Sequence, residues 1–233
     1  RADRCQSLPG WGSVEAVYAD LDDDGRADLV FANASENSTD RDPGSYIYLN
    51  SEQGFAMQPS VALPTTRAHG VACADLNRNG YLDLVFGGFD NPELLIFYGS
   101  PGGWDVEQPA RIWMEHEGVL YKEPRWVHLA DLNNDGYLDL IVPQSGFDRF
   151  FILWGGPERF SMDRCQFLSV FRAVWTQAVD LSGNGYLDLL IGSVAPSGEG
   201  PHDSFVYIYW NSAAGLSGSR RTMLPANHVN CMA

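Results

Sequence analysis

The apolar residues of this chain come in runs of about five, separated by segments rich in Gly, Pro, Asn, Asp and Ser. Four of these runs are "LVFAN" at 29–33, "LVFGG" at 84–88, "LIVPQ" at 140–144 and "LLIGS" at 189–193. Short runs rich in Val, Ile, Leu and Phe and bounded by turn residues are typical of β-strands, and no stretch shows the sustained 3.6-residue period of a helix. The pattern therefore predicts an all-β protein.

The runs belong to a repeat. Each follows an acidic loop, and the four loops read "DLDDDGRAD", "DLNRNGYLD", "DLNNDGYLD" and "DLSGNGYLD". They begin at Asp20, Asp75, Asp131 and Asp180, so successive copies start 55, 56 and 49 residues apart. An aromatic run follows in every copy: "YIYLN", "LIFYG", "FILWG" and "YIYWN". One structural unit is therefore written four times.

Each unit is predicted to hold four strands: one entering the acidic loop, one leaving it, the aromatic run, and a more polar fourth strand such as 57–63. The strand leaving the loop is apolar at consecutive positions, so both of its faces must be covered. A four-stranded sheet that is covered on both sides and repeated at this spacing predicts a β-propeller blade. A β-sandwich is the rival fold, but it gives no reason to repeat one loop in every fourth strand.

The chain is predicted to be a single β-propeller segment over residues 1–233. The string "DRCQSL" at the start matches "DRCQFL" at 163–168, and "MLPANHVNCMA" near the end resembles "ALPTTRAHGVA". We therefore expect four blades within a larger propeller or array, and a closed ring of four blades is the alternative. The predicted repeats are 9–64, 65–119, 120–168 and 169–225, with 1–8 as the outer strand of a preceding blade and 226–233 as the first strand of a following blade.

The loops share the pattern D-x-[DNS]-x-[DN]-G-x-x-D. Side-chain oxygens at positions one, three, five and nine and the backbone carbonyl at position seven can surround one cation, while Gly at position six permits a sharp turn. Such a set of hard oxygen ligands suits Ca²⁺, and no His or Cys is present to favour Zn²⁺. An EF-hand needs Glu at position twelve, where this chain has apolar residues. A plain Asx turn, the remaining alternative, does not explain the acidic residue at position nine.

The sequence thus predicts up to four Ca²⁺ ions as cofactors, one per loop. Among the predicted ligand side chains, four are carboxylates in loop one, two in loop two, three in loop three and two in loop four, so affinity should decrease from loop one to loop three to the other two. The predicted ligands are Asp20, Asp22, Asp24, the carbonyl of Arg26 and Asp28; Asp75, Asn77, Asn79, the carbonyl of Tyr81 and Asp83; Asp131, Asn133, Asp135, the carbonyl of Tyr137 and Asp139; and Asp180, Ser182, Asn184, the carbonyl of Tyr186 and Asp188.

Two sequons, four cysteines and the calcium-type loops together favour an extracellular setting. The formal net charge is −15 and Lys122 is the only lysine, which disfavours nucleic acid and anionic membranes as partners. No apolar run is long enough to span a membrane. Asn33 and Asn37 begin glycosylation sequons. The four cysteines, Cys5, Cys73, Cys165 and Cys231, allow two disulfides in three pairings, while a buried inert thiol is equally compatible with Cys73.

These repeats resemble the FG-GAP/VCBS family of calcium-binding propeller repeats, which is found in integrin alpha-subunit heads and in many secreted bacterial and fungal proteins. The string "VFGG" at 85–88 lies where that family has its phenylalanine-glycine signature. The resemblance implies a calcium ion in the hairpin between the first two strands of each blade, held by the ligands named above. It also implies a ring of about seven blades.

We expect calcium to be structural and the module to be non-enzymatic. The five histidines share no spacing around the loops, and the chain has no nucleophile or phosphate-loop motif. The leading hypothesis is a secreted or cell-surface module that uses its loops for adhesion to a protein or glycan ligand, or for assembly with copies of itself. The insertion at 112–124 is the best candidate contact surface. The alternatives are the propeller portion of a secreted carbohydrate-active enzyme, such as a polysaccharide lyase, and a lectin.

Overall fold

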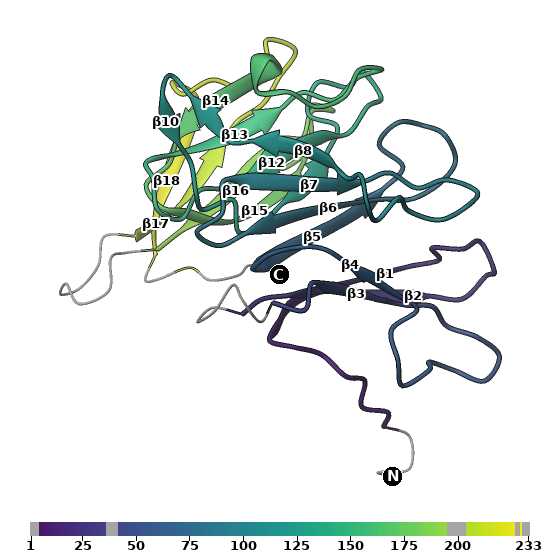
Figure 1. The fold of residues 1–233 in the computed structure, drawn as a ribbon. Helices are drawn as coiled ribbons and strands as arrows, with labels where there is room; N and C mark the ends of the chain where they lie inside the picture. Colours follow the sequence, from purple (N-terminus) through teal and green to yellow (C-terminus); the bar gives the residue numbers. More distant parts are fainter. Residues whose placement is uncertain (1–4, 36–41, 195–203, 227–228, 230–233) are drawn as a thin grey trace.

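Antiparallel strands dominate the computed structural model, which describes residues 5–35, 42–194, 204–226 and 229 (Figure 1). They form four sheets of four strands each and one short two-stranded hairpin. Within the described residues, the one helical segment is a 3-10 turn at Met162–Arg164, and no helix there could cross a membrane. The predicted all-β class with four-stranded units is therefore confirmed.

Every sheet is built from four strands that are consecutive in the chain and are hydrogen-bonded in chain order. The strands are β1 (Ser13–Ala19), β2 (Asp28–Asn33), β3 (Ser45–Tyr48) and β4 (Val61–Leu63) in sheet 1; β5 (Ala68–Ala74), β6 (Asp83–Gly88), β7 (Glu93–Phe97) and β8 (Ala110–Trp113) in sheet 2; β11 (His128–Ala130), β12 (Asp139–Val142), β13 (Arg149–Leu153) and β14 (Cys165–Ser169) in sheet 3; and β15 (Ala173–Val179), β16 (Asp188–Ser193), β17 (Ser204–Tyr209) and β18 (Arg221–Ala226) in sheet 4. The hairpin pairs β9 (Glu115–His116) with β10 (Val119–Leu120).

The acidic loops connect the first strand of each sheet to the second. In each hairpin the residue just before the loop pairs with the last aspartate of the loop: Ala19 with Asp28, Ala74 with Asp83, Ala130 with Asp139 and Val179 with Asp188. This shared register places every loop at the same end of its sheet.

Apolar clusters lie between each sheet and the next. In β6, Val85 belongs to the cluster shared with sheet 3, whereas Leu84 and Phe86 belong to the cluster shared with sheet 1. In β12, Leu140 faces sheet 2 and Ile141 faces sheet 4. Successive side chains of a strand point to opposite faces, so the consecutive apolar residues after each loop bury both faces of the central sheets, as the sequence predicted.

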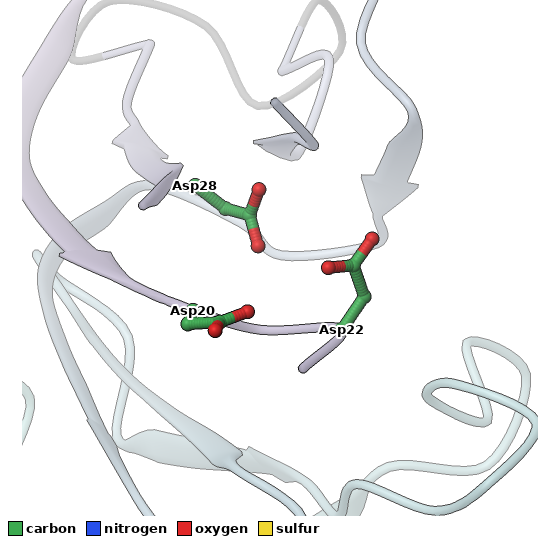
Figure 2. A group of neighbouring side chains, drawn as sticks. All are labelled: Asp20, Asp22 and Asp28. Carbon is green, nitrogen blue, oxygen red and sulfur yellow. The ribbon is translucent and has the colours of Figure 1, made fainter. Parts of the chain in front are cut away.

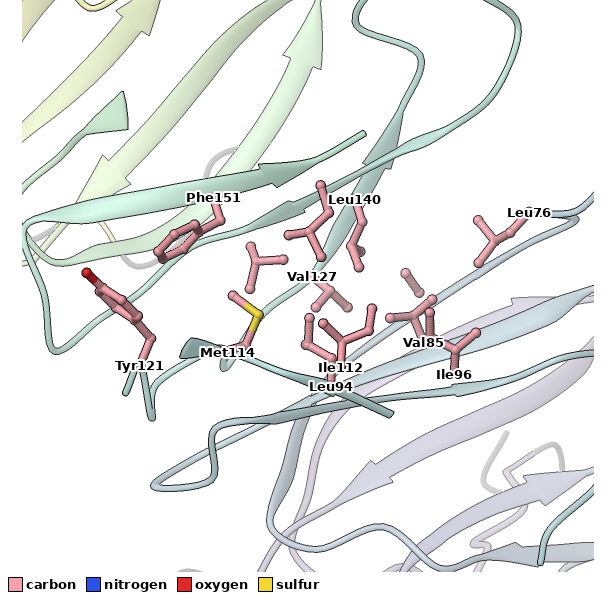
Figure 3. Packing of buried hydrophobic residues seen from close by; sticks show 13 residues of the cluster. Leu76, Val85, Leu94, Ile96, Ile112, Met114, Tyr121, Val127, Leu140 and Phe151 are labelled. Atoms are coloured by element: carbon pink, nitrogen blue, oxygen red, sulfur yellow. The ribbon is translucent and has the colours of Figure 1, made fainter. Parts of the chain in front are cut away.

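The cluster between sheets 2 and 3 also draws residues from the predicted insertion at 112–124 (Figure 3). Met114 and Tyr121 are buried there, and the Tyr121 ring centroid lies 4.7 Å from that of Phe151. Trp113 and Val119 of the same insertion are exposed. The insertion is thus partly a core element, which limits the surface it can offer to a partner.

The sheets meet along their first strands. β1 contacts β5, and β11 contacts both β5 and β15, whereas no two fourth strands in the described part of the chain make a comparable contact. The outer side of sheet 1 is less covered than the interfaces: Tyr18 of β1 is 78% exposed, and Val14 is also exposed.

Three details differ from the expected strand boundaries. The fourth strand of sheet 1 begins at Val61 instead of residue 57. Residues 5–8, predicted to belong to an outer strand, form no strand in this structure, because an isolated strand has no neighbour to satisfy its backbone groups. Ala226, predicted to begin the following strand 226–233, instead ends β18 and pairs with Ser204. Residues 1–4, 227–228 and 230–233 lie outside the described part of the chain.

Candidate metal centres

The first aspartate of each loop organises the turn. Asp20 accepts hydrogen bonds from the backbone N–H groups of Asp24 at 3.0 Å and Gly25 at 2.8 Å. The same two bonds form in the other loops, to Asp75 from Asn79 and Gly80, to Asp131 from Asp135 and Gly136, and to Asp180 from Asn184 and Gly185. Both oxygens of this side chain thus hold the backbone in a tight loop before any cation is considered.

The middle of each loop uses an Asx turn and a left-handed glycine. The position-five side chain accepts the N–H of position seven, as Asp24 does from Arg26 at 2.9 Å. Asn79, Asp135 and Asn184 make the equivalent bond. The glycines at position six have φ values of 85°, 88°, 85° and 85°, a region that side chains disfavour, which explains why all four copies keep glycine.

The last aspartate of each loop is fully buried and accepts at least two backbone hydrogen bonds. Asp139 accepts the N–H of Leu132 at 2.9 Å and that of Gly155, just beyond β13, at 2.8 Å. Asp28, Asp83 and Asp188 are equally buried and make the same pair of bonds. Each carboxylate therefore ties its loop to the end of the third strand.

The loop pattern predicts position nine only as a metal ligand, so these two backbone hydrogen bonds are a further role of this residue. Burial raises the pKa of Asp139 to about 6, and the backbone bonds from Gly155 and Leu132 offset part of that effect. Burial also raises the pKa of Asp83. The sequence does contain a sign of this role. The position-nine aspartate stands directly before an apolar strand in all four copies, where it must be buried and must therefore accept hydrogen bonds from nearby donors.

Loop one brings three carboxylates together (Figure 2). Ligand oxygens of Asp20, Asp22 and Asp28 all lie within 4.8 Å of one another. Desolvation, followed by the charges of Asp28 and the other loop carboxylates, raises the pKa of Asp22. Converging carboxylates that repel one another are a fitting ligand set for a divalent cation with a preference for oxygen, so these residues can hold Ca²⁺.

Asp24, the other predicted carboxylate ligand of loop one, is turned aside. One of its oxygens lies 2.7 Å from Nη1 of Arg26, and the other accepts the Arg26 N–H. The structure thus places Asp24 in an ion pair with the residue whose carbonyl was the predicted position-seven ligand.

Elsewhere in the described part of the chain, three carboxylate, His or Cys ligands do not converge in this way. In loop three, Asp135 is occupied by bonds from the Tyr137 N–H at 2.8 Å and the Asn133 amide at 3.0 Å. In loops two and four, the amides of Asn79 and Asn184 donate to Gly99 and Asn211. Asn77, Ser182 and the carbonyls of Tyr81, Tyr137 and Tyr186 remain predicted ligands.

The structure describes one of the two predicted glycosylation sites and three of the four cysteines. Asn33 is fully buried, and its amide donates to the Gly44 carbonyl at 2.9 Å, so a glycan there would displace packed structure. Asn37 and Cys231 lie outside the described residues. The other three cysteines, Cys5, Cys73 and Cys165, are free thiols, and desolvation raises the pKa of the half-buried Cys73 to about 12, as expected of an unreactive thiol.

Comparison with known proteins connects these loops to a family. Residues 12–86, which contain loops one and two, match the family model of the FG-GAP-like repeat. Integrin alpha-5 of Xenopus laevis is 28% identical over a match that covers 62% of this chain and 15% of the integrin. The predicted resemblance to FG-GAP repeats is therefore confirmed.

The fold also resembles a solved structure. A lectin of Agrocybe aegerita, described as specifically recognising non-reducing terminal N-acetylglucosamine, superposes with a TM-score of 0.51 at 17% identity. The match covers 89% of this chain and 52% of the lectin chain. At this identity the similarity concerns the fold alone, and this chain spans only part of the length of both relatives.

Proposed function

We propose that this chain, which carries FG-GAP-like repeats, is an extracellular β-propeller module that binds structural calcium and mediates adhesion or other protein contacts. The similarity to an integrin alpha subunit supports an extracellular or cell-surface setting and a non-catalytic role. The observation that carries the proposal is the convergence of Asp20, Asp22 and Asp28 in a loop whose backbone geometry recurs four times.

The propeller is supported by how the sheets pack. Successive sheets bury their faces against each other, and contacts between them run along the first strands, which would line the axis of a propeller. We propose that the four sheets are consecutive blades covering 9–64, 65–119, 120–168 and 169–225. The exposed side of sheet 1 is then the face that would receive another blade.

Calcium would act as a structural clip. Bound in loop one by Asp20, Asp22 and Asp28, it would neutralise carboxylates that repel one another and fix the hairpin between β1 and β2. The same role is proposed for the other three loops, with weaker binding because amides and a hydroxyl replace carboxylates. Of the two sequons, we propose Asn37 as the glycosylation site, because Asn33 is fully buried.

Isothermal titration of chelator-treated protein with Ca²⁺ tests this proposal. We expect Asp22→Ala to weaken the tightest site by about tenfold or more, since losing a charged ligand contact costs on the order of 1.5–3 kcal/mol. Glu117→Gln, which removes an exposed carboxylate from the β9–β10 hairpin, is the control and should bind like the parent. Saturation at a hundredfold excess over Kd should stabilise the fold by about 2.7 kcal/mol. Absence of calcium uptake by the parent protein would refute the proposal.

Glycan binding is the second candidate, and the fold similarity to the Agrocybe aegerita lectin favours it. A glycan array probed with the calcium-loaded protein distinguishes the two. Selective retention of one glycan class on the array, without turnover, would identify a lectin. Depolymerisation of an acidic polysaccharide, measured in solution, would point to the enzyme alternative.

A further inference from the structure

A cavity of about 590 Å³ lies between the acidic loops of sheets 1 and 2. Its lining includes Asp22 and Asp23 of loop one, Gly80 and Tyr81 of loop two, and Trp104. A related cavity between sheets 2 and 3 measures about 270 Å³ and is lined by the repeat-equivalent segments 76–77 and 156–160. The two interfaces come from the same repeat, so the difference in volume must arise from particular side chains.

Two arginines occupy the interface between sheets 2 and 3. Arg78, at position four of loop two, donates a hydrogen bond to the Gly136 carbonyl of loop three, and its guanidinium carbon lies 4.1 Å from the centroid of the Tyr137 ring. Arg159 lies over Tyr98, at 5.6 Å from the ring centroid. The interface between sheets 3 and 4 repeats the link between loops, because Asn134 donates to the Gly185 carbonyl at 2.8 Å.

At the interface between sheets 1 and 2 this link is missing a donor. Position four of loop one is Asp23, which has nearly the same left-handed backbone as Arg78, with φ values of 61° and 59°. A carboxylate only accepts hydrogen bonds, so it cannot bond to the Gly80 carbonyl as Arg78 bonds to Gly136. In place of Glu158 and Arg159, the facing loop has two glycines, at 102 and 103, which leave the cavity open.

The open cavity therefore presents the groups that hold a guanidinium one interface further along. Gly80 and Tyr81 are the repeat equivalents of Gly136 and Tyr137, and Asp23 adds a negative charge beside them. A carbonyl, an aromatic face and a carboxylate together suit a cation with several N–H donors. A neutral sugar carries no positive charge to pair with the Asp23 carboxylate, so it is the weaker match to these three groups.

We propose that this cavity binds the guanidinium group of an arginine side chain presented by a partner protein. The inference specifies one contact of the interaction function proposed above and rests on that function. The residues that carry it, Asp23, Gly80 and Tyr81, include no predicted side-chain ligand of calcium. Calcium binding and guanidinium binding can therefore fail separately.

NMR titration of the calcium-loaded protein with N-acetyl-arginine methylamide tests the proposal. The uncharged isostere N-acetyl-citrulline methylamide serves as the matched probe, and N-acetylglucosamine probes the sugar alternative. We expect the arginine probe to shift the resonances of Tyr81 and Trp104 and the citrulline probe to bind at least about tenfold more weakly, as expected for loss of a charge-assisted hydrogen bond and a cation–π contact.

Two variants locate the site. Asp23→Asn keeps a residue that tolerates the left-handed backbone and should weaken the arginine probe by about tenfold. Asp23→Arg should abolish binding, because the new side chain would occupy the place of the probe, as Arg78 does between loops two and three. Glu117→Gln removes a carboxylate from another left-handed position, at φ 52°, and should leave the affinity unchanged.

Equal affinity for the arginine and citrulline probes, unchanged binding in Asp23→Arg, or preferential binding of N-acetylglucosamine at Tyr81 and Trp104 would each overturn the proposal. If the protein binds the arginine probe but takes up no calcium, the proposed guanidinium site is supported and the proposed structural role of calcium is refuted. The two proposals are thus separable in one set of samples.

Discussion

The contact between sheets 1 and 2 and the contact between sheets 2 and 3 are built from the same repeat but filled differently. At equivalent positions of the first strands, sheet 1 has Glu15, whose carboxylate accepts the Val71 N–H at 2.9 Å, and sheet 2 has Gly70. The core between sheets 2 and 3 also takes in Tyr121 of the insertion at 112–124, whereas the interface between sheets 1 and 2 leaves the cavity beside Asp23.

This comparison separates two layers of information in the repeat. The loop pattern and the apolar runs specify four similar sheets, because both are present in every copy. A few positions that vary between copies decide how large a cavity an interface leaves beside the acidic loops. Substitutions at those positions should therefore affect the two interfaces unequally.

Phe151→Ala should produce the largest difference. Phe151 is fully buried between sheets 2 and 3, so its removal should lower the free energy of unfolding by about 4 kcal/mol. Tyr46 holds the same register position on the outer side of sheet 1 and is only half-buried, so Tyr46→Ala should cost about 1 kcal/mol. Urea denaturation in saturating calcium measures both. Equal losses would mean that the outer side of sheet 1 is packed as well as the interface between sheets 2 and 3.

Gly70→Ala should have the next largest effect. A Cβ atom on Gly70 would lie 2.4 Å from the Arg125 carbonyl oxygen and 2.7 Å from the Trp126 Cα, and backbone atoms cannot move aside without displacing sheet 3. We expect a loss of about 2–3 kcal/mol, as for an overpacked core, by the same urea assay. Glu15→Ala, at the equivalent position of sheet 1, is the comparison and should cost less. A fully stable Gly70→Ala protein would contradict the close approach of these sheets.

Arg78→Ala should remove the contact between loops two and three. The lost bond to the Gly136 carbonyl and the lost contact with the Tyr137 ring are exposed to solvent, so we expect a loss of about 1 kcal/mol. Asp23→Arg, which installs the same link between loops one and two, should change stability in the opposite direction. Thermal unfolding of the two variants at matched calcium concentration measures both changes in stability. A shift of the same sign in both variants would contradict the equivalence of the contact between loops one and two and the contact between loops two and three.

The sheets were predictable because their determinants are local and repeated. Turn glycines, consecutive apolar residues after each loop and aromatic third strands all indicate the same unit, and the hairpin register follows from the loop length. The convergence of Asp20, Asp22 and Asp28 was also predictable, since these residues follow the spacing of oxygen ligands.

What could not be predicted depends on contacts between copies. The ion pair that turns Asp24 toward Arg26, the burial of Tyr121 and the link from Arg78 to Gly136 arise from side-chain choices that no periodic pattern encodes. The burial of Asn33 is of the same kind, because a sequon reports only the residues beside it. Sequence alone gave no measure of the space between loops one and two.

The smallest expected effect concerns pH and the carboxylate of Glu15. Burial between sheets 1 and 2 raises the pKa of Glu15, and the bond from Val71 only partly opposes that shift. A carboxyl group whose folded pKa exceeds its unfolded value contributes stability at low pH, and this contribution is lost as pH rises through the folded pKa. Between about pH 4 and 7, the parent protein should therefore lose stability relative to Glu15→Gln, whose side chain does not titrate.

Urea titrations of the two proteins across this range, at constant ionic strength and saturating calcium, measure that difference. Using the difference between them removes the titration of the loop carboxylates, which both proteins share. The interface between sheets 2 and 3 supplies the counterpart, since Gly70 cannot titrate and Gly70→Ala should leave the pH profile parallel to that of the parent. A difference between the parent and Glu15→Gln that stays constant with pH would mean that Glu15 is solvated, and that the interface between sheets 1 and 2 is looser than its hydrogen bond to Val71 indicates.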